Sequence, residues 1–351
     1  MAKIYGERWE TIKSLGEGGQ AHTYVVRDLQ GNNAACYVLK RLRDINRIDR
    51  FRREIEAIRN LNHENIVRLI DFHIDDPKPY LVTEYCVGGN LAETTPFWSE
   101  DPLIAIELFR QICAGVAHAH AQGIIHRDLK PENIFLRQER GPAVVGDFGI
   151  CYIHSSSDRL TSVGGGGVGP RLFMAPELED NRDEEVSSRA DTYSLGKLLY
   201  WLLSGGRVFS REKHRDPQWD LKGANEDSNL GWNNIYMEHV NRLLDVMIVH
   251  DKNKRRTVGN IASMLPRVAT RIRREFNPVA DEIGQPCTYC GYGTYKSRAN
   301  NLTSVSNFGF VPVGDPTWRI YVCDLCGHVQ AFRLDLTERM PWWEEPQTLA
   351  E

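Results

Sequence analysis

Three glycines followed by a lysine and a glutamate form the first candidate binding site. Gly16, Gly18 and Gly19 lie close together, and such glycines let the backbone approach a phosphate and point its amides at it. Lys40 follows in a short β-leaning run. Glu54 follows on a segment with helical periodicity, on a face from which it can reach a lysine. These residues predict a nucleotide-phosphate site, against the alternative of an ordinary glycine-rich hairpin with solvated charges.

Four motifs further along the chain are far more specific. They are HRDLKPEN at residues 126–133, DFG at 147–149, APE at 175–177 and DTYSLG at 191–196. With these motifs in this order, the sequence resembles the eukaryotic-type Ser/Thr protein kinase superfamily, and in particular its bacterial members. The resemblance extends over about residues 8–270. It implies an α+β, two-lobed kinase fold, with a β-rich first lobe containing one helix and a mainly helical second lobe.

The resemblance implies an ATP site. Lys40 would contact the α- and β-phosphates and be oriented by Glu54, while Thr83 would be the gatekeeper. Glu84 and Cys86 would belong to the hinge, whose backbone bonds adenine. The nucleotide-binding residues implied in this way are Gly16, Gly18, Gly19, Lys40, Glu84, Cys86, Asn133 and Asp147.

The resemblance also implies how phosphate would be transferred. Asp128 would accept the proton of the substrate hydroxyl, Lys130 would face the γ-phosphate, and Asn133 and Asp147 would hold Mg²⁺. This division suits phosphoryl transfer, which needs placement and charge neutralisation more than covalent help. Lys130 in this motif is typical of Ser/Thr kinases, so the expected substrate is a protein Ser or Thr hydroxyl. The catalytic residues implied are Asp128, Lys130, Lys40 and Glu54.

Other motif residues are implied to be structural or regulatory. Glu177 would pair with Arg255, Asp191 would brace the backbone of the catalytic loop, and His126 would pack. Arg127 stands where the family often binds a phosphorylated activation loop, so activation by autophosphorylation is predicted. The candidate hydroxyl residues, which are otherwise ordinary polar loop residues, are Ser155, Ser156, Ser157, Thr161 and Ser162.

Two departures from the family pattern favour an alternative. Pro170 stands where the family often has a threonine that is hydrogen-bonded near the catalytic residues, and proline cannot make that bond. The run Gly164 to Gly167 is costly to order, because glycine loses the most conformational freedom. The alternative is a pseudokinase that binds nucleotide and acts as a scaffold. Against it, every catalytic residue of the family is present.

Four cysteines near the C-terminal end form two CxxC pairs, Cys287 with Cys290 and Cys323 with Cys326, each followed by glycine. Four thiolates in two such pairs make a tetrahedral Zn²⁺ site, which has no open position and is therefore structural. Disulfides or a redox pair are the alternatives, and a reducing compartment argues against disulfides. The pattern resembles a zinc ribbon.

The function of this ribbon is open between sensing or recruitment of a partner protein and binding of nucleic acid. Basic residues beside aromatic ones could form a nucleic-acid face. The favoured interpretation is that the aromatic residues pack a small module with little other core. The residues concerned are Lys296, Arg298, Arg319, Arg333, Tyr292, Tyr295 and Trp318.

The elements that carry these residues follow from hydrophobic periodicity. Apolar residues every three or four positions from Ile45 to Ile58 predict a helix, with Asp44 as its cap. Further helices are expected from Leu103 onward. They should run near residues 103–116, 195–203, 240–248 and 261–272, and strands are expected near 24–27, 35–41, 66–86, 307–311 and 319–322.

The predicted domain limits follow from these patterns and the resemblance. They are 1–85 for the first kinase lobe, 86–276 for the second, 277–286 for a linker, 287–336 for the zinc ribbon and 337–351 for a tail.

Composition and charge exclude several classes of protein. The 351 residues are 41% hydrophobic and 26% charged, which excludes a mainly disordered or fibrous chain. The net charge of −4 excludes a global basic field for nucleic acid. The longest apolar run, Leu198 to Leu203, is far shorter than the roughly 20 residues of a membrane span. Residues 1–9 lack a secretory pattern. A cytoplasmic protein without membrane partners is therefore expected.

Overall fold

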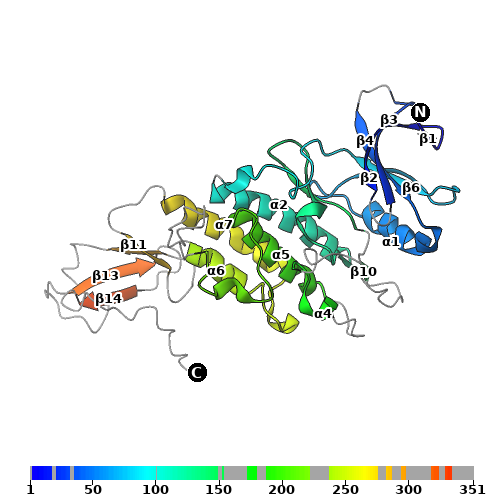
Figure 1. The fold of residues 1–351 in the computed structure, drawn as a ribbon. Coiled ribbons are helices and arrows are strands. Elements are labelled where there is room, and N and C mark those ends of the chain that lie inside the picture. Colours follow the sequence, from blue (N-terminus) through cyan, green and yellow to red (C-terminus); the bar gives the residue numbers. More distant parts are fainter. Residues whose placement is uncertain are drawn as a thin grey trace. The chain divides into compact units, whose positions relative to one another are not determined.

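A six-stranded antiparallel sheet forms the first lobe of the computed structural model (Figure 1). Its strands lie in the order β1-β2-β3-β4-β6-β5. Side chains alternate between its two faces, so Leu39 packs on one face while the adjacent Lys40 points to the other. The strands are β1 (Ile4–Tyr5), β2 (Trp9–Glu17), β3 (Ala21–Asp28), β4 (Cys36–Leu42), β5 (Leu69–His73) and β6 (Tyr80–Glu84).

One α-helix of this lobe, α1 (Ile48–Arg59), packs on the face of the sheet to which Lys40 points (Figure 1). Phe51 and Ile55 of the helix form a buried cluster with Leu42 and Leu81 of the sheet. Asp44 is a cap, as predicted, but its carboxylate accepts from the backbone N–H of Asn46 in a 3-10 turn, η1 (Ile45–Arg47). The α-helix therefore begins at Ile48 rather than at Ile45.

The opposite face of the sheet carries an outer-face aromatic cluster, which consists of Tyr5, Trp9, Tyr24, Tyr37 and Tyr80. Trp9 is fully buried, and its ring centroid lies 5.2 Å from that of Tyr37. Tyr5 meets Tyr80 edge-on at 6.0 Å and also contacts Tyr24. The chain ahead of β2 thus supplies part of a second core.

Polar contacts hold this first segment in place. The indole N–H of Trp9 donates to Asp71 at 2.6 Å, and Arg8 makes two hydrogen bonds to Asp28. Gly6 has a φ of +56°, and a Cβ there would lie 2.0 Å from the hydroxyl of Tyr80. Only glycine fits this close approach.

The second lobe is mainly helical, as predicted. Asp101 caps α2 by accepting from the backbone N–H of Leu103, and Leu108, Ile112 and Val116 bury one face of that helix. The helices are α2 (Pro102–Ala121), α4 (Pro176–Glu179), α5 (Arg189–Leu203), α6 (Met237–Asp245) and α7 (Val258–Glu275). The short strands are β7 (Ile124–Ile125), β8 (Ile134–Leu136), β9 (Ala143–Val145) and β10 (Tyr152–Ile153). The 3-10 turns are η2 (Phe97–Ser99), η3 (Pro131–Asn133), η4 (Lys213–Arg215) and η5 (Lys252–Lys254).

A four-stranded antiparallel sheet lies near the C-terminal end of the sequence. It consists of β11 (Glu282–Pro286), β12 (Thr294–Ser297), β13 (Trp318–Cys323) and β14 (Val329–Arg333), in that order. β13 contains the predicted strand 319–322. β11 lies within the stretch 277–286 that was predicted as a linker. Ile283 pairs there with Tyr295, and local periodicity carries no sign of such a partner strand.

The structure describes residues 2–17, 21–31, 35–99, 101–148, 152–153, 172–179, 187–221, 237–275, 282–286, 294–297, 318–323 and 329–333. The chain divides into two compact units, Met1–Lys213 with Leu244–Ser263, and His214–Leu243 with Met264–Glu351. Both lobes contribute to the first unit, and the small sheet belongs to the second. Within the described ranges, no helix combines the length and apolar character that crossing a bilayer requires.

Candidate functional site

Asp191, in the first turn of α5, anchors the loop that carries the HRDLKPEN motif. Its carboxylate accepts from the backbone N–H groups of His126 and Arg127, each at 2.8 Å, and lies 2.8 Å from Nε2 of His120. Burial alone would raise the pKa of Asp191, but the hydrogen bond from His120 and those from the backbone hold it below its ordinary value. This fully buried carboxylate therefore fixes the loop from its amino-terminal end, as predicted.

Lys40 lies between two carboxylates. Its Nζ donates to Glu54 Oε1 at 2.6 Å and to Asp147 Oδ1 at 2.9 Å. The ammonium of Lys40 lowers the pKa of Asp147 to about 2, whereas burial raises the pKa of Glu54 in spite of Lys40. A strand, a helix and the chain after β9 thus bring these three residues together. The Lys40–Glu54 pair was predicted from the sequence, whereas the contact between Lys40 and Asp147 was not.

Asp128 lies in a second polar cluster, formed within the loop itself. Lys130 Nζ donates to Asp128 Oδ2 at 2.8 Å. The η3 turn brings Asn133 back, and its Nδ2 donates to Asp128 Oδ2 at 3.0 Å and to the Asp128 carbonyl at 2.7 Å. The Asp128 side chain keeps about a quarter of its surface exposed. It is thus oriented by two neighbours and still accessible to a hydroxyl group.

The backbone around the two aspartates is unusual. Arg127 and Asp147 have φ values of +69° and +56°, in the left-handed region that few residues other than glycine adopt. His126 is buried, with its Nε2 2.9 Å from the Gly146 carbonyl and its ring 4.7 Å from that of Phe148. The predicted packing role of His126 agrees with these contacts, which link the two motifs.

Arg50 is a site residue that the sequence reasoning missed. It lies one helical turn before Glu54 on α1. Burial lowers the pKa of Arg50, and the carboxylates of Glu54, Asp147 and Asp128 oppose that shift. The i, i+4 spacing from Glu54 was the signal that could have indicated it.

The predicted hinge residues follow β6. Thr83 is half-buried inside that strand, and Glu84 is its last residue. The Glu84 carboxylate accepts two hydrogen bonds from Arg137 and one from the backbone N–H of Arg68. Burial raises the pKa of the Cys86 thiol to about 12, and this side chain packs in a buried cluster with Val67 and Val144.

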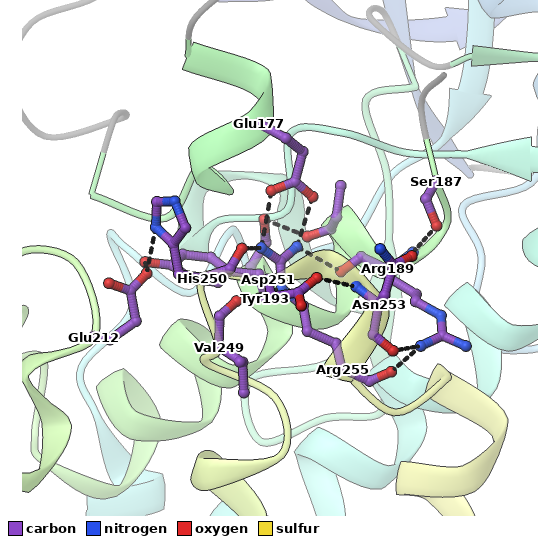
Figure 2. Close-up of polar contacts among 12 residues, drawn as sticks. Glu177, Ser187, Arg189, Tyr193, Glu212, Val249, His250, Asp251, Asn253 and Arg255 are labelled. Carbon is purple, nitrogen blue, oxygen red and sulfur yellow. Dashed lines mark hydrogen bonds and ion pairs between the residues drawn. The ribbon is translucent and has the colours of Figure 1, made fainter. Parts of the chain in front are cut away.

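Glu177 and Arg255 form the predicted ion pair (Figure 2). The two guanidinium Nη atoms donate to the two carboxylate oxygens at 2.6 and 2.8 Å. Arg255 is fully buried, and it also donates to the carbonyls of Val249, His250 and Arg189. The pair therefore fastens α4, which contains the last two residues of the APE motif, to the segment after α6.

Several predicted residues lie outside the described residues. Gly16 is described: it lies in β2 opposite Thr23, with a φ of +142° and open space where a Cβ would be. The predicted residues that lie outside the described ranges are Gly18, Gly19, Gly149, Ser155, Ser156, Ser157, Thr161, Ser162, Pro170, the run 164–167, Cys287, Cys290, Cys326, Tyr292, Arg298 and the strand 307–311.

The donor set near Asp147 suits a magnesium ion. Asp147 offers a carboxylate that is nearly half exposed. The amide nitrogen of Asn133 is bound to Asp128, so the oxygen is the atom that this side chain can offer. Carboxylate and amide oxygens are the ligands that Mg²⁺ prefers. In the described part of the chain, no cluster of three or more His, Cys, Asp or Glu residues could hold a metal ion. Of the four predicted zinc ligands, only Cys323 falls within that part.

Several curated proteins that resemble this chain are protein kinases by name. They include the serine/threonine-protein kinase Pkn1 of Myxococcus xanthus, 36% identical over 210 residues, which are 57% of this chain and 29% of that protein. The serine/threonine-protein kinase PrkC of Bacillus subtilis is 33% identical over 218 residues, 60% of this chain and 33% of that protein. Maternal embryonic leucine zipper kinase of Danio rerio is 32% identical over 232 residues, with coverages of 61% and 33%.

The chain thus spans about a third of the length of these relatives. The family model of the protein kinase domain matches residues 9–265. This match covers both lobes and every described residue of the two polar clusters. It confirms the predicted superfamily and the two-lobed fold: the chain belongs to the protein kinase domain family.

Proposed function

We propose that this chain is a protein kinase that transfers the γ-phosphate of ATP to a protein Ser or Thr hydroxyl. The observation that carries this proposal is the Lys40–Glu54–Asp147 cluster, formed beside a partly exposed Asp128. A buried glutamate fixes the lysine, and the lysine keeps Asp147 ionised. The serine/threonine specificity in the names of Pkn1 and PrkC and the Lys130 side chain beside Asp128 support the substrate class.

The residues would divide the work between them. Asp128, oriented by Asn133 and Lys130, would accept the proton of the attacking hydroxyl. Lys130, 2.8 Å from that carboxylate, would neutralise charge that develops on the transferred phosphoryl group. Lys40 would bind phosphate oxygens, and Glu54 would hold its ammonium in place. Each of these residues would have one role, and the reaction would need no covalent intermediate.

Asp147 and Asn133 would hold Mg²⁺ when ATP binds. When bound, the metal would supply charge neutralisation to the phosphates. The pKa of Asp147, about 2, keeps its carboxylate charged at neutral pH. This protonation state is the one that a magnesium ligand requires.

The test is transfer of labelled γ-phosphate from Mg-ATP to the protein itself and to a basic protein substrate. Asp128→Asn should reduce incorporation by at least about a hundredfold, the scale of a general base, while nucleotide binding remains. Asp75→Asn, at an exposed aspartate, is the matched control and should keep full activity. Wild-type incorporation that Asp128→Asn leaves unchanged would refute the role of Asp128.

The same assay discriminates the pseudokinase alternative. Tight nucleotide binding without any transfer, in either substrate arm, would favour a nucleotide-dependent scaffold. Mapping of the labelled residues tests autophosphorylation of the activation loop between residues 149 and 175. Label confined to other segments would contradict it.

The second part of the proposal is a zinc ribbon at the small sheet. Thr294 pairs with Pro286, and Tyr295 pairs with Cys323. The strand ends Pro286, Thr294, Cys323 and Val329 therefore lie at the same end of this sheet. In sequence, the first CxxC pair lies between Pro286 and Thr294, and the second begins at Cys323. That register supports one site with four thiolates, of the kind that holds Zn²⁺ structurally.

Metal analysis of the purified full chain tests this assignment. About one zinc per chain is expected, and Cys323→Ser should lose it. Cys36→Ser, at an exposed cysteine of the first lobe, is the matched control and should retain it. If the wild-type chain contains no zinc, or if Cys323→Ser retains it, the assignment of a zinc site is wrong.

The ribbon would serve sensing or recruitment, and a protein partner is the favoured occupant. Nucleic-acid binding is the second candidate, and it rests on the basic and aromatic residues of the sequence. Retention of the full chain on DNA or RNA that falls steeply with salt would support it. No retention at low salt would exclude it.

A further inference from the structure

One ion pair at the hinge touches none of the groups assigned to phosphate transfer. Arg137 follows β8 directly, and Glu84 ends β6. Arg137 Nε donates to Glu84 Oε2 at 2.9 Å, and Nη2 donates to Oε1 at 2.8 Å. Two parallel bonds of this kind fix the orientation of both side chains and not only their separation. The pair joins the start of the hinge in one lobe to the residue that follows β8 in the other.

The guanidinium group also holds the segment that follows α1. Its Nη1 donates to the carbonyl of Glu64, and its Nη2 lies 3.3 Å from the carbonyl of Ile66. This segment is tied to β9 as well, because Val67 and Val145 are joined by a backbone hydrogen bond of 2.9 Å. Arg137 therefore connects the chain after β8, the start of the hinge and the segment after α1. Because each of these segments also makes backbone hydrogen bonds elsewhere, the position of the guanidinium is fixed.

Glu84 is held from a further side. Its carboxylate accepts from the backbone N–H of Arg68 at 2.8 Å, and its own N–H donates to the Arg68 carbonyl at 3.1 Å. Burial alone would raise the pKa of Glu84, but the hydrogen bonds from Arg137 and Arg68 lower it. The carboxylate is thus charged at neutral pH, and it accepts three hydrogen bonds.

The segment just after the hinge is held by β8. Gly88 N–H donates to the Leu136 carbonyl at 3.0 Å, and Leu136 N–H donates to the Gly89 carbonyl at 2.9 Å. Arg137 is the next residue after Leu136. The segment after the hinge is therefore held by the backbone of β8, and the start of the hinge is held by the side chain of the residue that follows β8.

We propose that Arg137 is a positioning residue for the base of the nucleotide, acting through Glu84. This inference rests on the proposed function, in which the backbone from Glu84 to Cys86 bonds adenine. Hydrogen bonds to a base are directional and lose strength steeply when donor and acceptor are misaligned. Without the Arg137–Glu84 pair, the hinge would keep its backbone donors and acceptors but would hold them in a broader range of positions. Base affinity would fall, and phosphate affinity would not.

The experiment measures binding of three probes to the full chain by calorimetry: adenosine, Mg-ATP and inorganic tripolyphosphate. Arg137→Met removes the fork and keeps the aliphatic stem. Adenosine and Mg-ATP affinities should fall by the same factor, about tenfold for the loss of one charge-assisted interaction. Tripolyphosphate affinity should stay unchanged. In the transfer assay, KM for ATP should rise by a similar factor, with kcat within about twofold of wild type.

Two further variants sharpen the result. Arg137→Lys keeps the charge without the fork, so its affinities should lie between those of the wild type and Arg137→Met. Arg110→Met removes an arginine paired with Glu107 on the exposed face of α2 and should change nothing. Where Arg137→Met does not fold, Glu84→Gln breaks the same pair with a side chain of the same shape and should show the same pattern.

Each outcome decides a separate point. Unchanged adenosine affinity in a folded Arg137→Met or Glu84→Gln variant overturns the inference, and so does an equal loss for tripolyphosphate, which indicates general loosening. In both cases normal wild-type binding leaves the proposed function standing. A wild-type protein that binds neither adenosine nor Mg-ATP overturns the proposed function, and this inference with it.

Discussion

At the scale of single residues, Lys40 matters because its two carboxylate partners differ in environment. Asp147 is nearly half exposed and has a lowered pKa, whereas Glu54 is buried and has a raised one. A lowered pKa in the folded state stabilises the fold above the ordinary value, near pH 4, and that stabilisation is lost as the pH falls toward 2. A buried carboxylate without its lysine is costly while it stays charged.

Both effects give Lys40→Met the same pH dependence. The variant should be less stable than wild type at pH 7, and the difference should shrink as the pH falls from 7 to 3. In the variant, Lys40 no longer lowers the pKa of Asp147, so both Asp147 and Glu54 take up protons over this range and lose their uncompensated charge. Urea unfolding at several pH values measures the difference. Lys78→Met, at an exposed lysine, should show a small and constant difference. A Lys40→Met difference that grows in acid would contradict this reading of the cluster.

The Glu177–Arg255 pair predicts a large loss of stability from a small change. Glu177→Gln leaves a fully buried guanidinium without its counter-charge, which costs about 3 kcal/mol or more. Glu107→Gln makes the same substitution in an exposed pair with Arg110, where about 1 kcal/mol or less is expected. Urea unfolding of the two variants compares them directly. Equal losses would show that burial does not set the strength of the pair.

At the scale of elements, two glycines in helices have opposite surroundings. A Cβ at Gly115 of α2 would lie 2.5 Å from the Asn65 carbonyl oxygen, whereas one at Gly259 of α7 would meet nothing within 4 Å. Gly115→Ala should therefore push α2 away from the segment after α1 and destabilise the fold by roughly 1–3 kcal/mol. Gly259→Ala should stabilise it by up to about 1 kcal/mol through helix propensity. Thermal unfolding measures both. A neutral Gly115→Ala would mean that the segment at Asn65 yields at little cost.

Local pattern predicted most of the elements, because periodicity and caps are local. The resemblance carried the rest of the site, including the Lys40–Glu54 and Glu177–Arg255 pairs. What local pattern could not reveal depends on distant partners. Arg137 and Glu84 are 53 positions apart, and neither belongs to a motif that names the other. Strand β11 needs the pairing with Tyr295, which its own residues do not indicate.

At the scale of the whole molecule, the first compact unit carries both polar clusters, and the second contains the small sheet together with most of α6 and part of α7. If zinc holds the small sheet, a chelator should abolish the unfolding transition of that sheet and leave the main transition of the kinase lobes within about 2 °C. Differential scanning calorimetry with and without chelator measures this. Restored zinc should return the lost transition, and excess Mg²⁺ should not. A main transition that also collapses would show that the units unfold together.

The strand β1 has a consequence for how the catalytic domain is isolated. The family match begins at residue 9, which leaves out β1, Tyr5 and the Arg8 contacts to Asp28. A protein trimmed to that boundary loses a ring from the outer-face aromatic cluster and exposes the unpaired edge of β2. Unpaired sheet edges recruit other chains. Recombinant catalytic domains should therefore start upstream of Ile4, because a shorter one invites self-association that assays would misread as regulation.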